Sequence, residues 1–148
     1  MNDRALRIAL AGLSLAGLAV TGYLLSVRWG GAPLYCTTSG CETVQNSSYA
    51  VLLGIPVAAA GFLSYLALGA SALTTHPLAL AGAALFGLVA VAFSAYLLVI
   101  QMAVIDAVCQ WCVVGDVITV LLAAVVLLRF RDVAGAHSEP SSSPAESA

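Results

Sequence analysis

Four apolar stretches, each long enough to cross a lipid bilayer as a helix, constrain the fold of this chain more than any other feature. The hydrocarbon core of a bilayer is about 30 Å thick, and a helix of about 20 apolar residues spans it with its backbone amides hydrogen-bonded inside the segment. The predicted helices cover, in round numbers, residues 8–26, 51–73, 79–102 and 109–128. The sequence therefore predicts an all-α integral membrane protein, built as a bundle of four transmembrane helices.

The composition agrees with lipid as the solvent. Of the 148 residues, 61% are hydrophobic and only 8% are charged, which excludes an ordinary soluble globular domain. The net charge of -2 gives no indication of a nucleic-acid partner. We expect one membrane domain, residues 1–131, followed by a Ser- and Pro-rich tail, residues 132–148, that is disordered and cytoplasmic because it has no apolar periodicity.

The distribution of arginine predicts the orientation, since the chain has no lysine. Two arginines precede the first predicted helix, two follow the last, and one lies between the first and second helices: Arg4, Arg7, Arg129, Arg131 and Arg28, respectively. Positively charged residues accumulate on the cytoplasmic side of a membrane. Both termini are therefore predicted to be cytoplasmic, in a multi-pass protein of the cell inner (plasma) membrane.

This orientation places all four cysteines on the outer side. Cys36 and Cys41 lie in the longest loop, and Cys109 and Cys112 form a C-x-x-C motif where the fourth helix begins. A bridge across so short a loop removes little unfolded-chain entropy, so redox chemistry explains the motif better than stabilisation does. A helix N-terminus, for which Asp106 is a candidate N-cap, also favours the reactive thiolate.

Two other interpretations of the cysteines stay open at this point. The protein could be a non-catalytic membrane protein with two structural disulfides, since the outer side of a bacterial membrane is oxidising. It could also hold a metal on four cysteines, although the C-x4-C spacing of the loop pair and the absence of a zinc-knuckle turn argue against zinc. The spacing alone permits three pairings of the four cysteines.

A redox relay accounts for two cysteine pairs at one membrane surface. One pair would exchange with an external dithiol and the other would pass the electrons on, each step going through a mixed disulfide. A two-electron acceptor next to the hydrocarbon is most simply a lipid-soluble quinone.

Four motifs, in their order along the chain, make the sequence resemble the vitamin K epoxide reductase family in its bacterial, disulfide-generating form. They are "GLAVTGYLLSVRWG", "LYCTTSGCETVQNSS", "LLGIPVAAAGFLSYLAL" and "CQWC". The resemblance covers about residues 8–128. It implies a four-helix quinone reductase that takes electrons from a separate thioredoxin-like periplasmic or extracellular protein and passes them to menaquinone or ubiquinone, supporting disulfide bond formation.

The resemblance also implies a role for each cysteine. Cys36 would meet the partner, Cys41 would carry the electrons to Cys109, and Cys112 would react with the quinone. Ser47 falls where the family has a loop serine near the quinone site, although "NSS" before an apolar run also resembles a helix N-cap.

Asp116 stands four residues after Cys112, where the animal enzymes have a tyrosine that contacts the quinone. On a helix it shares a face with Cys109 and Cys112, at i, i+3 and i+7. A buried, neutral carboxyl there could donate a hydrogen bond or a proton to a quinone oxygen, or it could bond to a neighbouring helix. The animal enzymes also have a quinone-binding asparagine near the start of the second helix, and the matching region here, "SSYAVLLG", offers none at the aligned place. We therefore expect a plain quinone substrate and not an epoxide.

Overall fold

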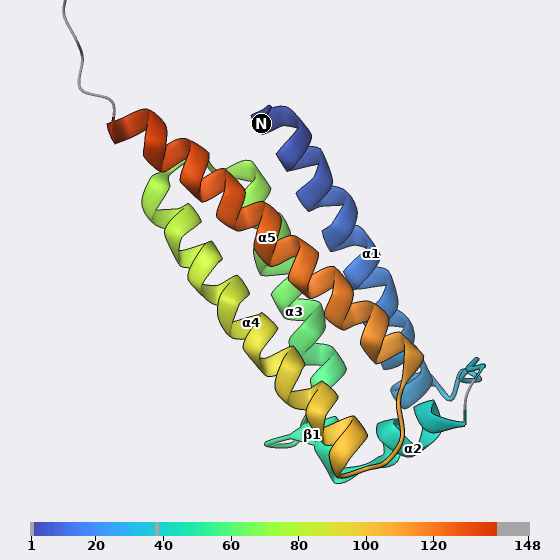
Figure 1. The fold of residues 1–148 in the computed structure, drawn as a ribbon. Coiled ribbons are helices and arrows are strands. Elements are labelled where there is room, and N and C mark those ends of the chain that lie inside the picture. Colours follow the sequence, from blue (N-terminus) through green and yellow to red (C-terminus); the bar gives the residue numbers. More distant parts are fainter. Residues whose placement is uncertain (1, 38, 139–148) are drawn as a thin grey trace, which may run out of the picture.

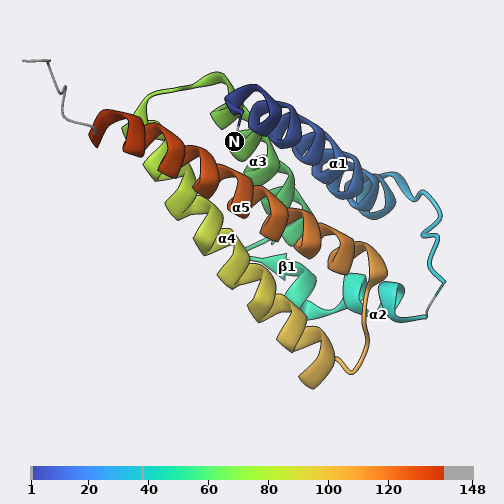
Figure 2. The same ribbon diagram turned by 45° about the horizontal axis from the view of Figure 1, so that its top comes forward.

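The computed structural model describes residues 2–37 and 39–138, and the described chain forms a bundle of apolar helices with a small cap at one end (Figure 1). The bundle consists of α1 (Asp3–Gly30), α3 (Val57–Ala70), α4 (Pro77–Ala103) and α5 (Gln110–Ser138). Shorter elements connect them: α2 (Gly40–Asn46), the 3-10 turns η1 (Ser48–Ala50) and η2 (Ser71–Leu73), and the strands β1 (Val51–Leu52) and β2 (Ile55–Pro56). The N-terminus and the end of α5 lie at one end of the bundle, whereas α2 and β1 lie at the other (Figures 1 and 2).

Three of the helices are long and apolar enough to cross a membrane, namely α1, α4 and α5 as far as Ala136. The fourth apolar helix, Val57–Leu73 including η2, is shorter. The all-α membrane architecture predicted from the sequence is therefore confirmed in outline. The number of four spans and the cytoplasmic location of both termini stay predictions.

The second predicted helix, residues 51–73, begins later than expected. Residues 51–56 form a two-stranded antiparallel hairpin in which Val51 pairs with Pro56 and Leu52 with Ile55. The turn between the strands has positive φ at Leu53 (52°) and Gly54 (84°), the backbone that a two-residue hairpin turn requires. The helix then starts at Val57. Hydrophobicity alone did not distinguish this hairpin from a helix.

Helices α1 and α5 also extend beyond the apolar stretches predicted from the sequence. Helix α1 starts at Asp3, where the Asn2 side chain accepts a hydrogen bond from the Arg4 amide, and ends at Gly31 in the left-handed conformation. Helix α5 continues to Ser138, so the prediction of a disordered tail is wrong for residues 132–138; residues 139–148 lie outside the described part. A helix ends where its hydrogen bonding ends and not where its hydrophobicity does, and the first proline after the apolar stretch is Pro140.

The bundle helices pack closely through small residues. An ideal Cβ on Gly17 would lie 2.6 Å from the ring of Tyr65, one on Gly69 would lie 2.9 Å from Ser14, and one on Gly87 would lie 3.3 Å from α5. Such approach is how helices associate where lipid removes the hydrophobic driving force. The core of the bundle is made of buried side chains from all four helices: Leu10, Tyr65, Leu68, Ala72, Ala84, Ile118, Leu122 and Val126.

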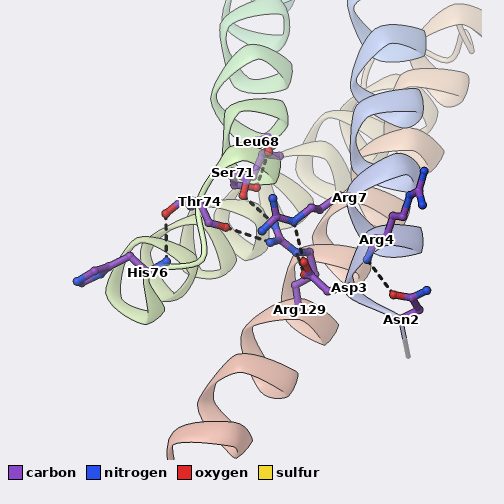
Figure 3. Close-up of polar contacts among 9 residues, drawn as sticks. All are labelled: Asn2, Asp3, Arg4, Arg7, Leu68, Ser71, Thr74, His76 and Arg129. Atoms are coloured by element: carbon purple, nitrogen blue, oxygen red, sulfur yellow. Dashed lines mark hydrogen bonds and ion pairs between the residues drawn. The ribbon is translucent and has the colours of Figure 1, made fainter.

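A buried arginine joins three elements at the end of the bundle that holds the N-terminus (Figure 3). The side chain of Arg129 is 0% exposed. Its Nε donates to Asp3 at 3.0 Å, Nη1 donates to the carbonyl of Ser71 at 2.8 Å, and Nη2 donates to the carbonyl of Thr74 at 3.0 Å. Asp3 also pairs with Arg7 at 2.7 Å. This charge, which the sequence analysis counted only for orientation, therefore ties α5 to the start of α1 and to the turn after α3.

We predict that Arg129→Ala destabilises the bundle. The substitution leaves the buried Ser71 carbonyl and the part-buried Thr74 carbonyl without their donor and removes one of the two arginine partners of Asp3, which should lower the free energy of unfolding by about 2 to 3 kcal/mol. Thermal unfolding in detergent, followed by tryptophan fluorescence, measures the change. Arg131→Ala, at an exposed position of the same helix, is the control and should unfold like the wild type; equal effects of the two substitutions would contradict the prediction.

Candidate active site

All four cysteines meet at the end of the bundle that carries α2. Cys36 and Cys41 form a disulfide with a Cα–Cα distance of 6.3 Å, whereas Cys109 and Cys112 are free thiols. Cys41 and Cys109 are both 0% exposed and belong to one buried cluster with Val44, against which the other two cysteines pack. The fully buried member of one pair therefore lies in the same buried cluster as the fully buried member of the other.

A glycine allows the two pairs to approach. Gly40, the first residue of α2, lies directly against the backbone of Val108, the residue before Cys109. An ideal Cβ on Gly40 would overlap the carbonyl oxygen of Val108 and lie 2.9 Å from its nitrogen. Only glycine permits this contact between two backbones, and the contact brings Cys41, the next residue of α2, beside Cys109.

Cys109 occupies the N-cap position of α5. The helix begins at Gln110, and the Cys109 carbonyl accepts the hydrogen bond of the Val113 amide at 3.1 Å. The Cys109 sulfur accepts from the amide of Cys112 at 3.4 Å, which is the bond that a capping side chain makes. Asp106, the candidate cap from the sequence, is exposed in the preceding loop with a φ of 52° and does not cap the helix. The reactive sulfur itself serves as the cap.

Hydrogen bonding favours the thiolate of Cys109, which lies directly before α5. The side chain of Cys112, and then the amides of Cys112 and Trp111, lower the pKa of Cys109 from 9.0 to about 7, against the opposing effect of burial. The thiolate is the form that attacks a disulfide. Of the inner pair, Cys109 is therefore the sulfur that is more readily a thiolate, and a thiol of low pKa also leaves a disulfide more readily.

Gln101 holds the backbone of Cys109 and was missed by the sequence analysis. This side chain of α4 is 4% exposed, and its Oε1 accepts from the Cys109 amide at 2.9 Å. Its own carbonyl accepts from the Ala107 amide at 3.0 Å, which fixes the loop between α4 and α5. A lone amide side chain near the end of an apolar helix was the signal in the sequence that could have identified it.

A cavity of about 290 Å³ adjoins the inner cysteine pair. Its wall is mostly apolar and includes Cys112, together with aromatic side chains from three bundle helices: Tyr65, Phe86, Phe93 and Trp111. The Tyr65 hydroxyl donates to the carbonyl of Gly115 at 2.8 Å, which anchors its ring at the wall. An apolar cavity of this kind, with few polar groups, is typical of a small-molecule site.

Ser47 and Asp116, the candidate cofactor-binding residues from the sequence, both line this cavity. Ser47 is the C-cap residue of α2 and the N-cap residue of η1, but its hydroxyl donates to the carbonyl of Val44 at 2.7 Å and makes no side-chain cap bond to η1. Asp116 receives a hydrogen bond from Ser94. Its Oδ2 is buried and has no hydrogen-bond partner within the described part of the chain. A buried carboxyl oxygen without a partner at a cavity wall is a site where a ligand can donate or accept a hydrogen bond.

The disulfide bears on the alternative of a metal held by four cysteines. Cys36 and Cys41 are joined to each other, so the four sulfurs are not four free thiolate ligands. Within residues 2–37 and 39–138, no group of three or more His, Cys, Asp or Glu side chains is placed to hold a metal ion.

A comparison with protein families adds to this geometry. Residues 8–127 match the model of the Vitamin K epoxide reductase family. The matched stretch runs from α1 into α5 and contains the four cysteines, Ser47 and Asp116. The predicted resemblance to this family is therefore confirmed, and its bacterial, disulfide-generating form stays a prediction.

We predict that Gly40→Ala separates the two cysteine pairs. The Cβ would push α2 away from the backbone of Val108, so Cys41 should bond less readily to Cys109. In a Cys36→Ser/Cys112→Ser background, the equilibrium formation of the Cys41–Cys109 disulfide in glutathione buffers should fall by about tenfold or more. The matched control is Gly30→Ala, because nothing lies within 4 Å of a Cβ at Gly30. Equal disulfide formation in both variants would show that the contact at Gly40 does not bring the two cysteine pairs together.

We also predict that Cys109 titrates near neutral pH. With the outer disulfide intact, the ultraviolet absorbance of the thiolate should rise with a midpoint of about 7. Because the side chain of Cys112 is the main cause of the lowered pKa, Cys112→Ala should move the midpoint upward, toward 9.0. Val114→Ala, an exposed position on the same helix, should leave it in place. A midpoint insensitive to Cys112→Ala would refute the assignment.

Proposed function

The family match over residues 8–127 covers most of the chain, so the chain belongs to the vitamin K epoxide reductase family, and on this basis we propose a function. We propose that the protein is a membrane thiol:quinone oxidoreductase. It would reoxidise a separate thioredoxin-like protein on the outer side of the plasma membrane and so support disulfide bond formation. Family membership implies a membrane oxidoreductase. The observation that carries the finer proposal is the shared cluster of Cys41 and Cys109, with Cys112 at the wall of an apolar cavity.

The outer pair suits exchange with a partner protein. Cys36 is partly exposed and Cys41 is fully buried, so a partner's thiolate would attack the sulfur of Cys36. A bond forms between the partner and Cys36, the Cys36–Cys41 bond breaks, and Cys41 leaves as a thiolate. The partner's second thiol then attacks its own mixed disulfide, which releases the partner oxidised and Cys36 reduced.

Transfer to the inner pair uses the buried cluster. The Cys41 thiolate attacks Cys109 of an oxidised Cys109–Cys112 pair, forming Cys41–Cys109 and releasing Cys112. Cys36 then attacks Cys41, which restores the Cys36–Cys41 disulfide and releases Cys109 as a thiolate. The products are an outer disulfide and an inner dithiol, and this is the arrangement of the cysteines in the structure.

The cavity fits a lipid quinone as the electron acceptor. A bound menaquinone or ubiquinone accepts two electrons and two protons. The apolar wall would hold the ring, and Cys112 would be the thiol nearest to it. Asp116, whose Oδ2 lacks a partner within the described residues, would donate a hydrogen bond and then a proton to a ring oxygen, and Ser47 lines the same cavity. Inner-pair oxidation would release the protons of Cys109 and Cys112 next to these groups.

The first test is quinone reduction by the purified protein. Reduced dithiothreitol or a thioredoxin-like protein is the donor and a short-chain quinone is the acceptor, with the quinone absorbance as readout. We expect the wild type to consume quinone and each single variant, Cys36→Ala, Cys41→Ala, Cys109→Ala and Cys112→Ala, to lose this activity by about a hundredfold or more. If the two inner-pair variants matched the wild type and changed only its stability, the cysteines would be structural.

A second prediction concerns Asp116. Asp116→Asn keeps the shape of the side chain but removes its proton, so quinone reduction should slow by about tenfold or more. Exchange between the outer pair and dithiothreitol should be unaffected, and mass spectrometry of alkylated peptides measures it separately. Asp106→Asn in the exposed loop is the control. Equal quinone reduction by Asp116→Asn and wild type would remove Asp116 from the mechanism.

A further inference from the structure

The segment that carries Cys36 is hydrogen-bonded to the two middle residues of the C-x-x-C motif. The indole Nε1 of Trp111 donates to the carbonyl of Tyr35 at 2.8 Å. On the other side of Cys36, the amide and the hydroxyl of Thr37 donate to Oε1 of Gln110, at 3.1 Å and 2.5 Å. The residues before and after Cys36 are thus both attached to the first turn of α5.

Helix α1 also contacts the segment before Cys36, and it packs against Trp111. The Tyr23 hydroxyl donates to the carbonyl of Pro33 at 3.1 Å and accepts from the amide of Tyr35 at 2.8 Å. The ring of Tyr23 packs against that of Trp111, with 5.2 Å between centroids. Trp111 is therefore fixed on one side by α1 while its indole N–H fixes the loop.

We propose that Gln110 and Trp111 are positioning residues that return Cys36 to the Cys41–Cys109 disulfide and so complete the transfer between the pairs. In this step the Cys36 thiolate attacks the sulfur of Cys41. The Cys36–Cys41 bond forms, the Cys41–Cys109 bond breaks, and Cys109 leaves as a thiolate. The inference deepens the proposed function and rests on it for the order of the steps.

The return of Cys36 needs such a restraint because this cysteine has two sites of action. It meets a partner outside the protein and then reacts with Cys41, which is fully buried. A loop held by bonds on both sides of Cys36 keeps its thiol at high effective concentration beside Cys41. Since these bonds come from Gln110 and Trp111, the loop is aligned with the motif that contains the leaving sulfur.

The test uses a chain in which the second inner cysteine is removed. In a Cys112→Ser background, two-electron oxidation in a glutathione buffer can form three disulfides, of which Cys36–Cys41 and Cys41–Cys109 are the two compared. Quenching with N-ethylmaleimide and mapping the peptides by mass spectrometry gives the ratio of the two disulfides. The measurement needs neither a quinone nor a partner protein, and circular dichroism checks that each variant is folded.

We expect Gln110→Ala to shift this ratio about threefold toward Cys41–Cys109, and the added substitution Trp111→Phe to bring the shift to about tenfold, because each removes hydrogen bonds at a partly exposed site. Gln110→Glu keeps an acceptor oxygen and should restore the wild-type ratio. Val114→Ala on the same helix is the control. A ratio unchanged in the double variant, or shifted equally by Val114→Ala, would overturn the inference.

The outcome is independent of whether the protein reduces quinone. Absence of quinone reduction in the wild type would count against the proposed function, and the disulfide ratio would still decide whether Gln110 and Trp111 position Cys36. Conversely, an unchanged ratio would remove these two residues from the relay and leave quinone reduction by the four cysteines intact. If turnover is observed, the double variant should accumulate Cys41–Cys109 during it.

Discussion

A backbone amide in hydrocarbon has no water with which to form a hydrogen bond. The rest of the structure depends on this constraint. It commits the apolar stretches to helices and leaves irregular backbone only at the ends of the bundle. The thiol chemistry is therefore confined to one end, where α2 and the loop before α5 pack on each other through Gly40 and Val108. The same end contains a helix N-terminus whose free amides bond to the sulfur of Cys109. The thiol chemistry lies at this end of the bundle because the backbone amides that bond to the sulfur are free only where a helix begins.

Much of the fold could be predicted from hydrophobicity, since lipid imposes a strong and simple pattern. The parts that could not be predicted are those in which local backbone geometry decides the outcome. The hairpin at residues 51–56 is as apolar as the helix that follows it, and only the positive φ values of Leu53 and Gly54 distinguish them. The extension of α5 to Ser138 follows from hydrogen bonding in a segment that is no longer apolar. The lengths of the apolar stretches therefore predicted the helices but not the residues at which all of them begin and end.

The candidate site shows the same division. The cysteines were identifiable because their side chains carry the chemistry, and Asp116 because a carboxylate in an apolar run is unusual. Gln101 was missed because its role is to accept a hydrogen bond from one backbone amide across a loop. Contacts of this kind have no characteristic residue spacing by which a sequence would reveal them. The helix cap was assigned to Asp106 because aspartate is a common capping residue, whereas the structure uses the sulfur of Cys109. Contacts between residues distant in sequence account for these differences.

The two ends of the bundle differ in how they are held. At the end with the N-terminus, the guanidinium of Arg129 joins α1, α5 and the turn after α3 through bonds that no redox step changes. At the other end, the covalent links among the helices and loops are the disulfides that the proposed cycle would make and break. The bonds of Arg129 would therefore keep the same connections through a redox cycle, whereas the connections at the cysteine end would change with each step. The fold would keep its strength at the end remote from the sulfurs and leave the bonds that change beside the surface a partner must reach.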